Sequence, residues 1–557
     1  MILYEGSNEI RFNYDLGHSA GDLLNVAGIE NSDGSIGLRY AGLSTSNVRG
    51  RSVLFYLGEP GTTNPEPEPD PDPQPDLDAD GDGYTVAQGD CDGLIDENCP
   101  VAAASRFYFP LLAAAPQTYL GLVNNHDSLV LSGVLEAYNG AGNLLPAGRK
   151  MIELKPLARQ EFALAEIFPE SEEEPAYVVF AGDAGATAQG YCRFIDQDAM
   201  RGTSYPALFP QKGLRELYVP YLLYGSGWST VIGFVSHSDL QLSAEIQFNN
   251  GAKSRFLMRP HGQLKLTLVE DSPVTYNGAE VTLGELSPAT AATIKFTHIF
   301  AGAEDLVVGA VLYQNESQMG ATELGSASYQ QLQVSSFVMD DYWWSSLAFY
   351  NPSSAARTAG ECPLQFNSYS GAGKRLDAPV TDSLPSALGA LEGLVLLANQ
   401  LPAGTNRLEL DSGCAVAGIE FLGTGDAMDC VTVSDLAAKS GVFARLQYRE
   451  KGAWSGLSLL NRATEGARVT LIAYDDEGNY LGEEEHRIEP RAQLSGLPED
   501  LFSRLLSAPS CVRYVADHAL SGLVINYQST AATDAGPKSA LIDILPALVL
   551  ETSGSLY

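Results

Sequence analysis

Features typical of catalysis and of membrane insertion are scarce in this sequence of 557 residues. Neither the HExxH spacing of zinc proteases nor the CxxC spacing of redox and metal sites occurs. No uncharged apolar run reaches the ~18–20 residues that a membrane-spanning helix requires. Residues 1–12, MILYEGSNEIRF, lack the basic start and apolar stretch of a signal peptide. We therefore expect a protein that is not an enzyme and has no membrane span.

Positive charge and cysteine are also sparse. Asp and Glu number 69 against 33 Lys and Arg, which gives a formal net charge of −36. Because such a surface repels phosphate backbones and anionic lipids, it argues against a nucleic-acid partner and favours cations. The seven cysteines do not form a dense disulfide framework.

Glycine and proline, in contrast, are abundant, at 55 and 30 residues. Together with an apolar content of 45%, they favour β-structure with many turns over helical bundles. Since a single core rarely grows past ~250–300 residues, several domains are expected. The predicted fold class is all-β, with tandem β-sandwich domains joined to a small calcium-binding loop module by an acidic, proline-rich linker.

Residues 1–58 alternate apolar and polar positions between Gly, Asn and Asp turns, which predicts short strands. The stretches ILYEGSNEIRFNYD, VAGIENSDGSIGLRYAG and GRSVLFY resemble the C-terminal half of a nidogen-like β-sandwich of secreted bacterial proteins. Because the earlier strands of that family are missing, the resemblance implies a truncated domain and a signal peptide lost from the same end. A small independent β-unit is the alternative.

Residues 59–77, EPGTTNPEPEPDPDPQPDL, are expected to form an acidic linker. Proline at every second position fixes φ and removes N–H donors, while the carboxylates between the prolines repel one another. This combination predicts an extended spacer of about 50 Å, at roughly 3.1 Å per residue.

Residues 78–100 continue with regularly spaced aspartates. In DADGDGY, alternating carboxylates, a glycine bend and a backbone carbonyl match the first half of a helix–loop–helix calcium loop. Position 12 of that pattern is Gly89 instead of glutamate, and no helical run flanks the loop, so this is not an EF-hand. From Asn64 to Pro100 there are twelve acidic residues and no Lys or Arg, so compaction requires a counter-ion. A solvated extension of the linker is the alternative.

The stretches DADGDGYTVAQGDCD and DCDGLIDENC resemble, in shortened form, the Asp-rich bacterial metal-binding repeats related to thrombospondin type 3 repeats. That resemblance implies bound Ca²⁺ and a disulfide between Cys91 and Cys99 that holds the loops. Such a disulfide predicts an oxidising compartment, and thus an extracellular or cell-surface protein. The expected calcium ligands are Asp78, Asp80, Asp82, the Tyr84 carbonyl, Asp90 and Asp92.

Residues 105–557 contain four copies of one unit, called repeats 1 to 4, in the ranges 105–212, 213–326, 327–436 and 437–557. Four landmarks recur in order: an opening aromatic residue (Tyr119, Trp228, Trp344, Trp454), an aromatic residue before a turn (Tyr138, Phe248, Tyr369, Tyr474), a proline (Pro156, Pro260, Pro490) and a closing glycine (Gly190, Gly309, Gly418, Gly522). A unit of roughly 110 residues with short alternating strands predicts a β-sandwich that has its own core. Repeat 3 lacks the proline, and a short helix and an insertion are expected there. The units resemble uncharacterised β-sandwich modules of secreted bacterial proteins, which imply no activity.

Smaller motifs have structural interpretations. SGAGK, residues 370–374, fails the phosphate-loop pattern and corresponds to the turns NGAGN and DDEGN of other repeats. The recurring tryptophans are expected to pack in cores. The adjacent Trp343 would point to the opposite strand face, where with Asp340 and Asp341 it forms a candidate patch for a glycan or a surface protein.

The cysteines outside the aspartate-rich segment suggest at most one further bridge. Cys362, Cys414 and Cys430 share repeat 3, and their pairing stays open. Cys192 and Cys511 are expected to be buried or unpaired.

Together these features predict a non-catalytic, extracellular or cell-surface, calcium-binding protein that acts as a scaffold, spacer or adhesin. The alternative is a fragment or accessory region of a secreted hydrolase whose catalytic domain is missing from this sequence. An upstream in-frame extension with a catalytic motif would favour the alternative, whereas one that completes a sandwich and a signal peptide would favour the first.

Overall fold

The computed structural model of this chain contains two compact units, residues 1–101 and 102–557, which are described separately. In the first unit the structure describes three strands. In the second it describes residues 106–549 except 113–116, 170–172, 184–187, 211–215, 239, 270–273, 277–278, 282–288, 299–306, 326–327, 335–336, 338–339, 341, 354–361, 377–385, 435–436, 448–451 and 530–539.

The first unit contains an antiparallel sheet in the order β1-β2-β3. Its strands are β1 (Val26–Glu30), β2 (Ile36–Tyr40) and β3 (Leu54–Phe55). The two longer strands are joined by the sequence NSDGS, whose residues favour turns. Short strands are therefore present in the described part of this unit, whereas EIRFNYDL, residues 9–16, lies outside it.

The regular structure in the described part of the second unit is almost all antiparallel strand, which confirms the predicted all-β fold of tandem sandwiches. Helical structure in the described residues comprises α1 (Leu164–Ile167), α2 (Pro498–Leu501) and the 3₁₀ turn η2 (Ala398–Gln400). Among the described residues, no helix has the length and apolar character to span a membrane.

Repeats 1 and 2 each form two sheets. Repeat 1 has the orders β4-β9-β6-β7 and β11-β10-β5-β8, and repeat 2 has β12-β19-β14-β15 and β18-β17-β16-β13-β20-β21. The strands are β4 (Arg106–Phe109), β5 (Gln117–Asn124), β6 (Leu131–Tyr138), β7 (Leu144–Leu154), β8 (Arg159–Ala163), β9 (Tyr177–Gly182), β10 (Ala188–Asp196), β11 (Arg201–Pro206), β12 (Glu216–Val219), β13 (Ser229–Ser236), β14 (Leu242–Phe248), β15 (Lys253–Met258), β16 (Gln263–Val269), β17 (Val274–Tyr276), β18 (Ala279–Val281), β19 (Ala292–His298), β20 (Val307–Gln314) and β21 (Met319–Glu323).

Repeats 3 and 4 are each organised around one long strand, β26 or β33, that pairs with strands on both sides of its sandwich. The strands are β22 (Tyr329–Val334), β23 (Trp344–Tyr350), β24 (Leu364–Tyr369), β25 (Gly393–Leu397), β26 (Arg407–Gly423), β27 (Met428–Val433), β28 (Ala438–Phe443), β29 (Ala453–Asn461), β30 (Ala467–Tyr474), β31 (Tyr480–Ile488), β32 (Gln493–Gly496), β33 (Cys511–Ser529), β34 (Ala540–Pro546) and β35 (Leu548–Val549).

One strand pairing is common to all four repeats and defines equivalent positions. The strand with the closing glycine pairs with the strand that contains or directly follows the opening aromatic residue: Gly190 with Leu122, Gly309 with Phe234, Gly418 with Phe349 and Gly522 with Leu459. In this register Trp344 and Trp454 are equivalent, while Trp228 lies one residue earlier. Residues counted from the closing glycine can therefore be compared directly between repeats.

The cores of neighbouring repeats are continuous with one another. The buried apolar cluster of repeat 1 also contains Val231, Leu312 and Met319 of repeat 2. The cluster of repeat 2 likewise contains Ile419 and Phe421 of repeat 3. In these two repeats, part of the apolar surface is therefore buried against the next repeat.

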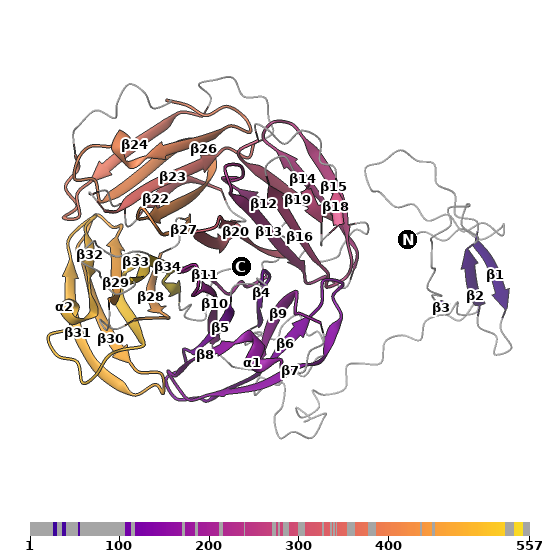
Figure 1. The fold of residues 1–557 in the computed structure, drawn as a ribbon, viewed down its shortest axis with the longest axis horizontal. Coiled ribbons are helices and arrows are strands. Elements are labelled where there is room, and N and C mark those ends of the chain that lie inside the picture. The colour runs from indigo at the N-terminus through magenta and orange to yellow at the C-terminus, as the bar shows by residue number, and fades with distance from the viewer. Residues whose placement is uncertain are drawn as a thin grey trace, which may run out of the picture. The chain divides into compact units, whose positions relative to one another are not determined.

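Within residues 102–557 the four repeats follow one another around a common centre (Figure 1). One strand of each repeat, the strand after the closing glycine, lies at this centre. These strands are β11, β21, β27 and β34, and each lies against the next, with β34 against β11. The repeats therefore form a closed ring in which repeat 4 contacts repeat 1.

A recurring contact joins repeat 1 to repeat 2, repeat 3 to repeat 4, and repeat 4 to repeat 1. The acceptor is a backbone carbonyl in the hairpin turn that follows the second landmark of one repeat. The donor is a backbone N–H in the next repeat, in the strand that begins after the proline turn. The N–H of Gln263 donates to the Gly140 carbonyl at 3.1 Å, that of Gln493 to Gly371 at 3.0 Å, and that of Arg159 to Asp476 at 3.0 Å. The last of these bonds joins repeat 1 to repeat 4, so the same head-to-tail contact closes the ring.

The proline landmark forms a tight turn whose third residue has positive φ. Leu157, His261 and Arg491 follow the prolines and have φ of 60°, 54° and 58°. Proline before a residue with positive φ is typical of a type II turn. In repeat 3, Leu391 has φ 58° after Ala390, so the same turn forms without proline. The segment expected to hold a helix there continues as β25 and η2.

The hairpin and cysteine predictions can be compared directly with the structure. SGAGK is a turn in which Ser370 N–H donates to Lys374 O at 2.9 Å, as predicted. Cys362 and Cys414 form a disulfide with Cα atoms 5.1 Å apart. Cys192, Cys430 and Cys511 are free and buried, which confirms the expectation for Cys192 and Cys511.

The glycines of the hairpin turns provide a test of ring closure. We expect Gly478→Ala to destabilise the protein strongly, because Gly478 has φ +81° and an added Cβ would lie 2.2 Å from the Pro156 carbonyl oxygen. The matched control is Gly251→Ala, where φ is +92° and no heavy atom lies within 4 Å of the added Cβ. Both variants bear the cost of alanine at positive φ, roughly 1 kcal/mol or somewhat more. Gly478→Ala should lose about 1–3 kcal/mol beyond that in chemical denaturation. Equal losses in the two variants would contradict the closing contact.

Candidate functional site at the centre of the ring

The residues predicted to bind calcium lie outside the described part of the structure. This applies to Asp78, Asp80, Asp82, Tyr84, Asp90 and Asp92, to Cys91 and Cys99, and to Asp341 of the candidate surface patch. Among the described residues, no group of three or more His, Cys, Asp or Glu side chains could hold a metal ion. The calcium module therefore stays a prediction.

The described members of the candidate surface patch lie at the boundary between repeats 3 and 4. The Asp340 carboxylate accepts the N–H groups of Tyr342 and Trp343, both at 2.7 Å, so it shapes the turn. Trp343 precedes β23 and packs against Trp454 and Tyr527 of repeat 4, with ring centroids 6.0 and 5.7 Å apart. The exposed ring is that of Tyr342, at 43%. Trp343 and Trp344 pack against different apolar clusters, and the ring of Trp343 is partly buried against repeat 4.

One further spacing in the sequence favours catalysis. Residues 17–21, GHSAG, match the G-x-S-x-G pattern around the nucleophile of many serine hydrolases. The segment lies outside the described residues, and a short pattern in a glycine-rich chain is a weak signal. It supports the hydrolase alternative only in sequence.

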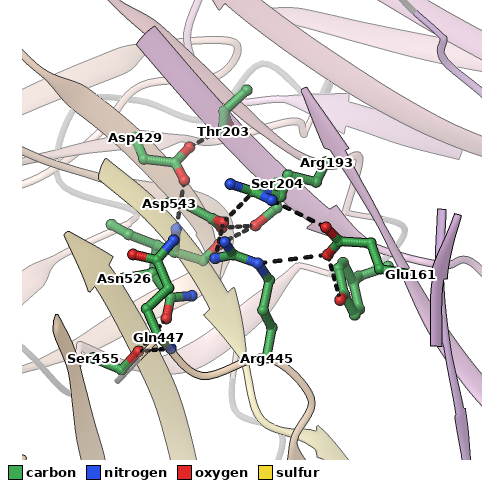
Figure 2. A network of polar contacts seen from close by, with 12 residues as sticks. Glu161, Arg193, Thr203, Ser204, Asp429, Arg445, Gln447, Ser455, Asn526 and Asp543 are labelled. Atoms are coloured by element: carbon green, nitrogen blue, oxygen red, sulfur yellow. Dashed lines mark hydrogen bonds and ion pairs between the residues drawn. The ribbon is translucent and has the colours of Figure 1, made fainter. Parts of the chain in front are cut away.

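The most extensive polar arrangement in the described residues lies at the centre of the ring (Figure 2). Its central member, Asp429 on β27, is completely buried. One carboxylate oxygen accepts the Thr203 hydroxyl at 2.5 Å, the Cys430 N–H at 2.8 Å and the Ala321 N–H at 3.2 Å. The other oxygen accepts the Ile544 N–H at 2.6 Å. Asp429 thus receives one hydrogen bond from each of the four repeats.

A charged group fills the adjacent boundary between repeats 4 and 1. Glu161 of β8 accepts Arg193 at 3.0 Å and the Tyr191 hydroxyl at 2.7 Å, and Arg159 lies 3.1 Å from it. Arg445 of repeat 4 lies 3.5 Å from the same carboxylate. Arg159 also forms an ion pair across the boundary with Asp476 of repeat 4, at 2.7 Å.

Asp543 of β34 connects this charged group to the centre. Arg445 donates to its carboxylate at 2.8 Å, and Arg193 forms an ion pair with it at 3.4 Å. The Ser204 hydroxyl donates to its other oxygen. Figure 2 shows the two arginines between Glu161 and Asp543. Since Asp543 is completely buried, its neutralisation by guanidinium groups offsets the cost of removing its charge from water.

The environment shifts the pKa values of these carboxyl groups in opposite directions. Burial alone would raise the pKa of Glu161, but the charges of Arg193, Arg445 and Arg159 lower it to about 2. Burial is the main cause that raises the pKa of Asp429 well above its ordinary range, and the negative charge of Asp543 raises it further. The hydrogen bonds that Asp429 accepts lower its pKa but do not offset these two effects. Glu161 is therefore ionised whenever the boundary is formed near neutral pH.

The geometry assigns this arrangement a structural task. Thr203, Asp429 and Asp543 are all completely buried, and their polar atoms are directed at partners in other repeats. Such a set of groups joins the strands at the centre and is closed to a substrate. It is the cross-link that fixes four sandwiches in one orientation.

The sequence contains one signal for this network, an aspartate inside an apolar strand, which the motif analysis does not include. In each repeat, the fourth residue after the closing glycine pairs with a residue of the central strand. These paired residues are equivalent and are Thr203, Gly320, Asp429 and Asp543. An aspartate inside an apolar strand such as AMDCVTV is unusual, because a buried carboxylate needs partners. An added Cβ at Gly320 would lie 3.3 Å from the Asp429 Cα, so a small residue fits this central position.

Comparisons with family models and with curated sequences supply no relative. No protein-family model matches the chain, and no curated protein sequence is significantly similar to it. The function must therefore be inferred from the chain itself.

Replacing Asp429 by asparagine tests the central cross-link. The amide group cannot accept at both ends, so at least one buried N–H, from Ile544 or from Ala321 and Cys430, loses its acceptor. We expect a loss of about 1–3 kcal/mol in the free energy of unfolding. Asp198→Asn, at an exposed position of repeat 1, should change stability by less than about 0.5 kcal/mol. Near-wild-type stability of Asp429→Asn would show that the cross-link is unimportant.

The charged boundary should make stability depend on pH in the acidic range. The folded pKa of Glu161 is lowered from 4.5 to about 2, so its contribution is complete above pH 4.5 and disappears as pH falls towards 2. The wild type should exceed Glu161→Gln by about 3 kcal/mol near neutral pH and match it near pH 2. Urea unfolding at several pH values measures this difference, with Glu166→Gln at an exposed position as the control for lost charge. A difference that stays constant with pH would contradict the assigned role.

Proposed function

We propose that this protein is a non-catalytic, calcium-binding scaffold or adhesive module that works outside the cell or on its surface. The observation that supports the scaffold part is the cross-link at the centre of the ring. Buried carboxylates and arginines join repeats that are far apart in sequence, and apolar cores continue across their boundaries. Such construction fixes the relative orientation of the repeats, which suits a protein that presents surfaces to a partner.

The calcium part of the proposal rests on the sequence of residues 78–100. Its aspartates follow an extended acidic linker and precede the ring in sequence. Calcium would neutralise these carboxylates and compact the segment, because carboxylate oxygens are the ligands that this ion prefers. The linker and the module together would set how far the ring is held from what precedes it. A glycan or a surface protein is the expected partner class.

The experiment is a calorimetric titration of the full chain with calcium chloride. The variant Asp78→Asn/Asp80→Asn/Asp82→Asn removes three expected ligands, and Asp70→Asn/Asp72→Asn/Asp76→Asn removes the same charge from the linker. We expect saturable binding with a Kd of about 10 μM that is lost in the first variant and kept in the second. At millimolar calcium such binding stabilises the module by about 2.7 kcal/mol. Absence of binding, or equal loss in both variants, would favour a solvated linker.

A further inference from the structure

The boundary between repeats 2 and 3 departs from the other three. In the described residues it lacks the backbone hydrogen bond that joins each other hairpin to the next repeat's turn. The hairpin glycines Gly142, Gly373 and Gly478 press against the next repeat, whereas Gly251 has no heavy atom within 4 Å of an added Cβ. A pocket with a volume of about 240 Å³ lies at this boundary. Residues of both repeats line its walls, with Trp228 among those from repeat 2.

This pocket occupies the same place in the ring as the charged group between repeats 4 and 1. The third residue after the tight turn is Glu161 in one case and Val395 in the other. The third residue after the closing glycine is Arg193 in one case and Phe421 in the other. The N–H of Gln447 donates to the Ser455 hydroxyl, and the N–H of Leu223 donates to the Thr230 hydroxyl in the same way, so Gln447 and Leu223 are equivalent. Two residues earlier, Arg445 is therefore the counterpart of Tyr221.

The replacements change the chemistry of this place from ionic to apolar. None of the eleven described residues that line the pocket is charged. Aromatic and aliphatic side chains form most of the wall, and Gln318 and Ser346 are the lining residues that are neither aliphatic nor aromatic. Trp344 is held in place because its Nε1–H donates to the Thr424 carbonyl at 2.7 Å.

The rim of the pocket is unusually apolar for an exposed surface. Val395 and Leu397 of β25 line it and are 41% and 48% exposed. β25 is the last strand of its sheet in the described part of repeat 3, so no further described strand pairs with its outer side. Exposed aliphatic groups beside a hollow lined with aromatic rings gain free energy when an apolar body covers them.

We propose that this pocket binds a small neutral molecule with an aromatic or alicyclic body and one hydrogen-bonding group. The absence of a carboxylate among its described lining residues disfavours a cationic ligand, and the net charge of −36 disfavours an anionic one. The volume exceeds the about 150 Å³ of an engineered apolar cavity that holds benzene, so a body of one or two rings fits. Gln318 and Ser346 supply the orienting polar contact. The site is independent of the proposed calcium module.

The test is a fluorescence titration of the full chain with N-phenyl-1-naphthylamine, a neutral aromatic probe. We expect saturable binding of one molecule per chain, unchanged between calcium and a chelator, so failure here is separate from failure of the calcium proposal. The sulfonated probe 1-anilinonaphthalene-8-sulfonate should bind at least tenfold more weakly. Comparable binding of both probes would indicate unspecific apolar surface and overturn the proposal.

Two variants place the probe in the pocket. Val395→Glu introduces at this boundary the residue type found at the equivalent position of repeat 1, and it should weaken binding at least tenfold. Val515→Glu is the matched control, because Val515 is 44% exposed in repeat 4 and lies outside the pocket lining. Ser346→Leu fills the pocket without charge and should weaken binding similarly, which covers the case in which Val395→Glu fails to fold. Unchanged binding in Ser346→Leu, or equal loss in Val515→Glu, would overturn the assignment.

Discussion

The second unit of this protein depends on one buried carboxylate and on the closed path of contacts around it. Asp429 accepts a hydrogen bond from each repeat, and the donors from the other three repeats lie more than a hundred residues away in sequence. A carboxyl group removed from water in this way requires its hydrogen-bond donors in place. The same requirement couples the sandwiches, since none of the four central strands can shift without leaving a polar group unpaired. The head-to-tail contacts between hairpins and tight turns act in the same direction at the periphery.

The four repeats keep their backbone pairing but have diverged in the side chains at their boundaries. The pair Glu161 and Arg193 has the counterpart Val395 and Phe421 two repeats further on. One arrangement fills its boundary with guanidinium and carboxylate groups, and the other leaves a hollow lined with aromatic rings. A ring of repeated units allows this divergence because a closed set of contacts tolerates one weaker boundary. Function can therefore develop at one boundary while the others maintain the fold.

Much of the fold follows from local patterns. Alternating strands, glycine turns and recurring landmarks predict a chain of sandwiches, and the turn at SGAGK forms as its repeat counterparts indicate. The prolines mark tight turns because proline fixes φ before a residue with positive φ. The candidate site was not predictable in the same way. Strand alternation separates Trp343 from Trp344, but only the tertiary contacts show that the Trp343 ring packs on repeat 4. The partners of Asp429 come from residues 203 to 544, and no sequence window contains them.

The amino-acid sequence by itself determined the strands, the turns, the four-fold repetition and the strong negative charge, because these depend on residues close to one another in the chain. It also determined the acidic linker and the spacing of Asp78, Asp80 and Asp82, on which the calcium proposal rests. Only the tertiary structure decided that the repeats close into a ring, that Asp429 and Asp543 meet arginines and hydroxyl groups of other repeats, and that one boundary is apolar and hollow. The reason is physical: a boundary is the sum of two distant surfaces, and its chemistry exists only after folding brings them together.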